Sequence, residues 1–266
     1  MFVIFSAADV KRDIRSRIRE CFNPSSASAE KVQVPGGTQF VKLTAVRRKG
    51  EIDWEDAACI VGGKKMNTIF TDAIRPEPDS PFCACAPELL PRLMLFNTAE
   101  KIIKRSCKPL ESSICVVDGD GILAAYAYRL CPLGAEIRVI TRSEGAYEQC
   151  AQRALETYGA TIFVSRSTSA LSECTCVISV CNNGSREQKN TLLINRPDMR
   201  FIIKGADFTV PEVYAGLCPG GTDIKLFAAA LCEYSGAHSL CTLSYDTVII
   251  NGKELTLDSA VNLIKS

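Results

Sequence analysis

The sequence contains a single histidine, His238, and a single tryptophan, and its formal net charge is only +1. With so little net charge, no broad electrostatic field attracts nucleic acid or an anionic membrane. No apolar run reaches the roughly eighteen residues of a membrane-spanning helix, and the first residues lack the features of a signal peptide. We therefore expect a cytoplasmic protein that binds neither nucleic acid nor a membrane.

The fourteen cysteines contain no C-x-x-C pair, because the close pairs Cys83/Cys85 and Cys174/Cys176 are spaced C-x-C. This spacing and the shortage of histidine argue against a metal site. Other cysteines, such as Cys115, lie inside apolar segments. That placement favours reduced thiols used as small hydrophobic side chains over a disulfide framework.

The first part of the chain predicts a small α/β domain. The capping-box-like pair Ser6 and Asp9 precedes apolar residues at helical spacing, Val10, Ile14 and Ile18, and so predicts a helix. Four short apolar or alternating segments predict strands, at 2–5, 40–45, 57–61 and 68–71.

Five prolines lie between residues 75 and 91 and mark a loop that leads into a helix at 89–104. We place a domain boundary there. The expected organisation is a small α/β N-terminal domain over 1–88 as a possible substrate domain, a linking segment over 89–112, and a dinucleotide-binding domain over 113–266.

Strands and helices alternate in the second part, which predicts an α/β domain with a Rossmann-like parallel sheet and helices on both faces. The expected strands are at 114–117, 136–140, 161–164, 176–180 and 201–204, and the expected helices at 122–133 and 146–158. Near the end, Thr222 or Asp223 can cap a helix that runs to Glu233. Two apolar segments flank Asn251-Gly252, which predicts a hairpin.

A glycine-rich turn follows the strand at 114–117 and opens the expected helix, with the sequence Gly119-Asp120-Gly121-Ile122-Leu123-Ala124. In a dinucleotide-binding domain, Gly119 would permit the tight turn, Gly121 the approach of a pyrophosphate, and Ala124 close packing of helix on strand. The alternative is an ordinary turn between a strand and a helix. The cofactor-binding interpretation is favoured, because the turn follows an expected strand, opens an expected helix and is followed by a second expected strand.

The second strand ends in Thr141-Arg142-Ser143, where an NAD-specific domain would place a carboxylate for the ribose hydroxyls. A guanidinium beside two hydroxyls suits the 2′-phosphate of NADP. The same absence of a carboxylate counts against a class I methyltransferase. The alternative is that Arg142 is a solvated loop residue.

These segments resemble the NADP-binding domain of the shikimate dehydrogenase family and its glutamyl-tRNA reductase relatives. In that family the second strand commonly ends Asn-Arg-Thr or Asn-Arg-Ser, similar to residues 141–143 here. The fourth strand ends in small or polar residues beside the nicotinamide, where this chain has Cys181 and Asn182. A shorter segment, 219–223, resembles a motif of the dehydrogenase-like subunit of dipicolinate synthase. The resemblance implies that Cys181 and Asn182 belong to the cofactor site.

Two features depart from the family. Asp118 and Asp120 place carboxylates at the phosphate-binding turn, where their charges oppose a pyrophosphate. The N-terminal region also lacks the Pro-x-Lys segment that carries the family's catalytic lysine. Lys65 and Asp72, which follow two expected strands, are instead our candidates for acid-base catalysis.

Two functions follow from these observations. The first is an NADP-dependent oxidoreductase that acts on a small hydroxy or keto compound bound between the two domains. The second is a catalytically inactive dehydrogenase-like protein with a binding or regulatory role. The sequence leaves the substrate open, and a homodimer is compatible with either function.

Overall fold

The computed structural model describes residues 1–9, 27–47, 51–63, 65–71, 74, 76–107, 112–180 and 190–265. The helix expected from Val10 onward lies outside them. The chain forms two compact units: unit 1 is Met1–Leu90 with Val210–Cys241, and unit 2 is Pro91–Thr209 with Thr242–Ser266. Residues 210–241, which the sequence assigned to the second domain, thus belong to the first unit.

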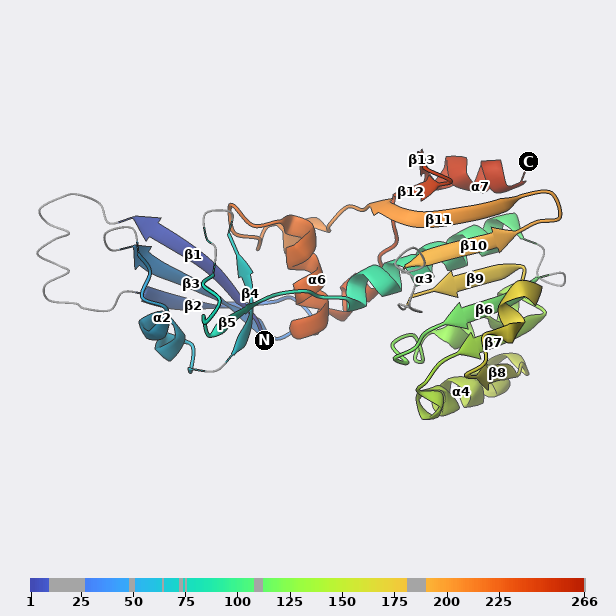
Figure 1. The fold of residues 1–266 in the computed structure, drawn as a ribbon, viewed down its shortest axis with the longest axis horizontal. Helices are drawn as coiled ribbons and strands as arrows, with labels where there is room; N and C mark the ends of the chain where they lie inside the picture. Colours follow the sequence, from blue (N-terminus) through green and yellow to red (C-terminus); the bar gives the residue numbers. More distant parts are fainter. Residues whose placement is uncertain are drawn as a thin grey trace, which may run out of the picture. The chain divides into compact units, whose positions relative to one another are not determined.

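Unit 1 contains a five-stranded sheet in the order β2-β3-β1-β4-β5 (Figure 1). Its strands are β1 (Val3–Asp9), β2 (Ala27–Gln33), β3 (Gln39–Arg47), β4 (Met66–Phe70) and β5 (Phe82–Ala84). Strand β2 is antiparallel to β3, whereas the β3-β1, β1-β4 and β4-β5 pairs are parallel. The strands expected at 2–5, 40–45 and 68–71 are therefore confirmed.

Helices cover both faces of this sheet. Successive side chains of a strand point to opposite faces, so apolar side chains of the sheet can pack against a helix on either side. Phe5 packs with Trp54 at the start of α2 (Trp54–Ile60), with ring centroids 5.1 Å apart. Phe2 and Phe40 pack with Phe227 of α6 (Ile224–Tyr234), at 6.2 and 5.3 Å. The short helix α5 (Glu212–Ala215) precedes α6, and a 3₁₀ helix at His238–Thr242 follows it.

The strand expected at 57–61 is wrong, since these residues belong to helix α2 and the turn after it. Asp53 caps the helix: its Oδ1 accepts a hydrogen bond from the Asp56 N–H at 2.9 Å. The helix buries Ala57 and Ala58 in the same apolar cluster as Phe5. Its small apolar face was too short to show a helical period in the sequence.

Unit 2 contains an eight-stranded sheet in the order β13-β12-β11-β10-β9-β6-β7-β8 (Figure 1). Its strands are β6 (Ser113–Val117), β7 (Glu136–Ile140), β8 (Ile162–Ser165), β9 (Cys176–Ser179), β10 (Thr191–Asn195), β11 (Arg200–Asp207), β12 (Thr247–Ile250) and β13 (Lys253–Thr256). Its helices are α3 (Leu89–Ser106), which begins in unit 1, α4 (Glu148–Tyr158) and α7 (Leu257–Lys265). Shorter 3₁₀ helices lie at Ala127–Leu133, Glu144–Tyr147 and Ser169–Glu173.

The first four strands of unit 2 are parallel and lie in the order third, second, first, fourth. This is also the order of the first four strands of a dinucleotide-binding sheet. The strands after β9 are antiparallel to their neighbours, so the parallel part of this sheet is limited to β6–β9. Short turns join β10 to β11 and β12 to β13, and only antiparallel neighbours can be joined by a tight hairpin.

The α-helix expected at 122–133 is also absent from this described part of the chain. Turns follow β6, and residues Ala127–Leu133 form a 3₁₀ helix that contains Pro132. Proline cannot donate the backbone hydrogen bond that an α-helix requires in its interior. The mixed α/β class is confirmed, with this local correction to the element after the glycine turn.

Candidate functional site

The glycine turn and the end of the neighbouring strand β7 lie together, as the sequence predicted for a parallel pair. The Arg142 N–H donates to the Gly119 carbonyl at 3.3 Å, and the Asp118 N–H donates to the Ile140 carbonyl at 3.0 Å. The fold therefore brings the two segments assigned to cofactor binding, 119–124 and 141–143, to one edge of the sheet.

Gly121 is required by the packing of the chain itself. Its φ is +78°, and a Cβ atom there would lie 3.0 Å from the Ala146 Cβ and 3.2 Å from the Ser143 Cβ. Both neighbours belong to the segment that follows β7. Ser143 and Ala146 thus take up the space in which a side chain at residue 121 would lie.

The Asp118 side chain accepts a hydrogen bond from a backbone N–H of the turn. This side chain is buried, and its Oδ2 accepts hydrogen bonds from the Leu123 N–H at 2.7 Å and from the Tyr147 hydroxyl at 2.8 Å. Tyr147 is itself fully buried. A backbone N–H that a phosphate would use is therefore bound to a carboxylate of the same chain.

Asp120 binds the arginine that the sequence assigned to a 2′-phosphate. Its Oδ1 lies 3.5 Å from Nη2 of Arg142, and its Oδ2 lies 3.2 Å from Nη1 of Arg92. The Arg142 side chain is nevertheless 80% exposed. Within the described part of the chain, its guanidinium pairs with Asp120 alone. An exposed ion pair of this kind contributes little to stability and exchanges readily with solvent.

The remaining cofactor candidates surround a small space. Ile122 and Ala124 line a cavity of about 240 Å³ together with Ala146 and Cys150. Pockets for small molecules usually measure about 300–1,000 Å³, and a dinucleotide needs the upper part of this range. Thr141 is buried, and its Oγ1 accepts a hydrogen bond from the Ser143 N–H at 3.0 Å, which shapes the loop after β7.

The residues of the turn do not fit a pyrophosphate bound at the start of a helix. No α-helix follows β6 in the described turn, so its N–H groups lack the aligned dipole that such a site uses. The Leu123 N–H is already bonded, and two carboxylates lie where the phosphates would bring further negative charge.

The proposed catalytic residues and the last two cofactor candidates remain predictions. Lys65 belongs to unit 1, where it is exposed and lies just before β4. Asp72, Cys181 and Asn182 lie outside the described residues.

Sequence reasoning missed Arg92 and Tyr147, which hold the two aspartates. Tyr147 follows β7 in the chain, and its place after a strand that neighbours the turn is a signal that the sequence contains. Arg92 lies in α3, 28 residues before Asp120, and no local pattern connects the two.

Comparisons with known proteins identify no relative: no family model matches the chain, and no curated protein or solved structure matches it. Within the described residues, no helix has the length and apolarity needed to cross a membrane. The same residues contain no group of three or more histidine, cysteine, aspartate or glutamate side chains placed to hold a metal ion.

Proposed function

We propose that this chain is a dehydrogenase-like binding protein that does not turn over a nicotinamide dinucleotide. The observation that carries the proposal is the buried Asp118 carboxylate, which accepts the Leu123 N–H inside the glycine turn. A phosphate could take that donor only by breaking its hydrogen bond to the buried Asp118, which would keep the Tyr147 O–H as its other donor. Hydrogen bonds to charged groups contribute about 1.5–3 kcal/mol each, so this exchange opposes binding.

An NADP-dependent oxidoreductase of a small hydroxy or keto compound is the second candidate. It is supported by the strand order of the parallel strands and by the exposed guanidinium of Arg142 at the end of β7. If Arg142 leaves Asp120, its five N–H donors are available for a phosphate at the surface.

Isothermal titration of the purified chain with NADPH and with NADH separates the two functions. We expect no binding heat for either dinucleotide up to millimolar concentration. We expect Asp120→Ala, which removes the exposed carboxylate and frees Arg142, to show no binding either, because Asp118 still accepts the Leu123 N–H. Gain of affinity for NADPH after this change would show that the Asp118 carboxylate does not close the turn to the cofactor.

Two arginine variants provide the matched comparison for a positive result. Micromolar binding of NADPH by the natural chain, weakened about tenfold or more by Arg142→Ala, would establish the second function instead. Arg166→Ala is the control, because Arg166 is also an exposed arginine near this edge of the sheet and pairs with Glu144 at 3.1 Å. Its loss should leave NADPH binding unchanged.

A further inference from the structure

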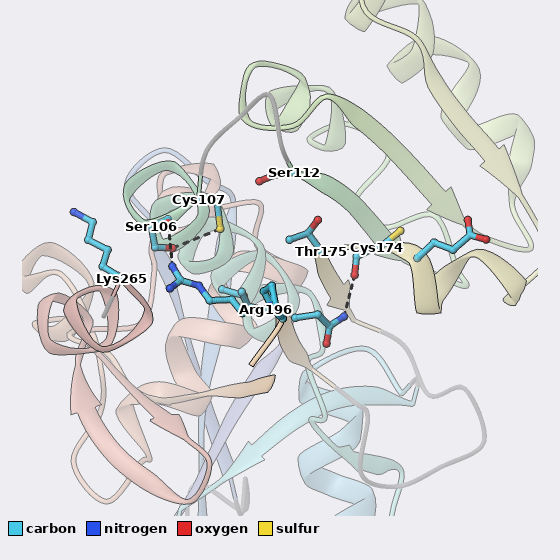
Figure 2. A pocket seen from close by; sticks show the side chains of 11 residues that line it. Ser106, Cys107, Ser112, Cys174, Thr175, Arg196 and Lys265 are labelled. Carbon is cyan, nitrogen blue, oxygen red and sulfur yellow. Dashed lines mark hydrogen bonds between the residues drawn. The ribbon is translucent and has the colours of Figure 1, made fainter. Parts of the chain in front are cut away.

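A larger pocket, of about 790 Å³, lies at the opposite edge of the sheet of unit 2, where β6 and β9 begin. The end of α3 contributes Ser106 and Cys107, and the segment after β10 contributes Arg196 (Figure 2). Lys265, from the last turn of α7, also lines it. This volume lies within the usual range for small-molecule sites.

The charges around the pocket favour an anion. Arg196 and Lys265 contribute two positive charges, and Glu173 contributes one carboxylate. The Glu173 carboxylate is already paired with Arg138, with Oε2 and Nη1 3.1 Å apart. Arg196 is anchored beside Cys107, because its Nη2 donates to the Ser106 carbonyl at 3.4 Å (Figure 2).

A second thiol lies behind the first. The Sγ atoms of Cys107 and Cys176 are 3.9 Å apart, and Cys176 is fully buried whereas Cys107 is partly exposed on the pocket wall. The Ser106 hydroxyl also lies 3.7 Å from the Cys107 Sγ. Since a disulfide bond is about 2.05 Å long, the two sulfur atoms need to approach by about 2 Å to form one.

The surroundings shift the pKa values of the two thiols in opposite directions. The hydrogen bond from Cys176 is the main cause that lowers the pKa of Cys107, and Ser106 and the charge of Arg196 lower it further, against the opposite effect of burial. The same hydrogen bond, together with burial, raises the pKa of Cys176. Cys107, which is partly exposed and lies near Arg196, is therefore the thiol favoured to ionise, whereas the full burial of Cys176 favours its protonated form.

Other cysteines of the chain show that proximity alone does not produce this arrangement. The Sγ atoms of Cys232 and Cys241 lie 3.6 Å apart, yet both residues are buried, whereas Cys107 is partly exposed; the hydrogen bond with Cys241, and then burial, raise the pKa of Cys232. Burial likewise raises the pKa of Cys115 to about 12 and that of Cys131 to about 11. Cys107 combines a neighbouring thiol, a nearby cation and a pocket.

We propose that Cys107 is a nucleophilic thiol site for small, carboxylate-bearing disulfides, and that Cys176 resolves the mixed disulfide formed there. This site is independent of the function proposed for the glycine turn. Arg196 and Lys265 would bind the carboxylates, and the pocket would hold the rest of the compound.

The reaction balances in two exchanges. The Cys107 thiolate attacks one sulfur of the disulfide R–S–S–R, a Cys107–S–S–R bond forms, and one R–S⁻ leaves. The Cys176 sulfur then attacks the Cys107 Sγ, its proton passes to the departing R–S⁻, and the Cys107–Cys176 disulfide forms. Two protein thiols are oxidised by two electrons, and one small disulfide is reduced to two thiols.

The test treats the reduced full chain with glutathione disulfide and maps every thiol by mass spectrometry under non-reducing conditions. We expect Cys107 to react about fivefold to tenfold faster than the exposed Cys59, because a larger thiolate fraction outweighs its lower intrinsic nucleophilicity. The final product should contain the Cys107–Cys176 disulfide. Equal rates at Cys107 and Cys59 would overturn the proposal.

Three variants separate the steps. Cys176→Ser should trap glutathione on Cys107, whereas Cys107→Ser should abolish both products. Arg196→Gln should slow the reaction with glutathione disulfide more than the reaction with cystamine, a cationic disulfide. Cys232→Ser is the control for the other close thiol pair, and it should change none of these rates.

A measurement on the natural chain keeps the proposal testable if a variant fails to fold. The rate at which iodoacetamide alkylates Cys107 rises with pH as the thiolate forms. Because the pKa of Cys107 is lowered, the half-maximal rate should occur below about pH 8.5, the value for an ordinary thiol. A midpoint at or above that value would refute a nucleophilic role for Cys107.

Discussion

The Asp118 carboxylate is a buried charge that two donors of different origin hold, one from the backbone of the glycine turn and one from a tyrosine side chain. A buried charge is costly when its hydrogen bonds are lost, because water cannot replace them. This side chain therefore adds a buried link between the turn after β6 and the segment after β7, beside the Arg142–Gly119 hydrogen bond.

Asp118→Asn removes the charge and keeps the size of the side chain. We expect the free energy of unfolding to fall by about 1.5–3 kcal/mol, since both hydrogen bonds lose their charge assistance. Urea denaturation followed by circular dichroism measures the change. An unchanged midpoint would mean that the carboxylate does not hold the turn.

Tyr147→Phe is the matched variant, because it removes one donor and leaves the buried ring in place. We expect a loss of about 1.5–3 kcal/mol, the usual contribution of one hydrogen bond to a charged group. The two changes should not add in the double variant, because they act on the same hydrogen bond.

At the scale of residues, the sequence predicted where the turn lies but not what fills it. Asp118 and Asp120 were visible as charges that oppose a phosphate. Their partners Tyr147 and Arg92 lie 29 and 28 residues away, and such contacts depend on how β6, β7 and α3 are arranged. Local patterns contain no information on these distant pairs.

Among the elements, helix α6 shows how one side chain sets the start of a helix. Asp223 is its N-cap, and the Oδ1 atom accepts hydrogen bonds from the N–H groups of Lys225 at 2.8 Å and Leu226 at 3.1 Å. These N–H groups have no partner inside a helix, so the carboxylate satisfies donors that would otherwise need water.

We expect Asp223→Ala to lower the free energy of unfolding by about 1 kcal/mol, within the usual range of about 0.5–2 kcal/mol for the loss of an N-cap. Chemical denaturation of the purified variant measures it. Asp223→Asn should remain close to the natural chain, because asparagine caps helices as well as aspartate does. An equal loss in both variants would point to the charge instead of the cap.

Elements with strong local signals were predicted well. The start of α6 at Asp223 and the hairpin around Asn251-Gly252 are confirmed, and both hairpin residues have positive φ, of 48° and 89°. The elements at 57–61 and 122–133 were wrong, because their apolar residues do not distinguish a strand from a short helix or a 3₁₀ helix from an α-helix. Strands β2, β5 and β10 were not predicted.

At the scale of the molecule, the chain passes from one unit to the other three times, after Leu90, after Thr209 and after Cys241. The segment that returns to unit 1 brings α6, whose Phe227 packs against Phe2 and Phe40. Phe227 is fully buried. The core of unit 1 is therefore complete only when both of its segments, 1–90 and 210–241, are present.

Phe227→Ala leaves a cavity in that core. We expect it to destabilise unit 1 by about 3–5 kcal/mol, as is usual for the truncation of a buried phenylalanine. Amide hydrogen exchange should then show faster exchange in β1 and β3, while β6 and β7 keep their protection.

Phe163→Ala is the control for this experiment, because Phe163 is 55% exposed on the edge strand β8. It should change the free energy of unfolding by less than about 0.5 kcal/mol. Faster exchange throughout both units after Phe227→Ala would show that they unfold together.

The prolines near residue 90 indicated the first passage between the units, but no local pattern indicated that residues 210–241 return to unit 1. The local composition does not change where the chain returns to unit 1, because α6 has the composition of an ordinary apolar helix. Only the long-range packing of Phe227 distinguishes it.

This arrangement has a consequence for synthesis on the ribosome. The segment with Phe2 and Phe40 leaves the exit tunnel well before Phe227, and at about 5–20 residues per second the delay is roughly 10–40 s. During that time the nascent chain displays apolar side chains that its own sequence has not yet covered. A chaperone that binds newly made polypeptides would find its principal target in the first ninety residues, and release would follow translation of α6.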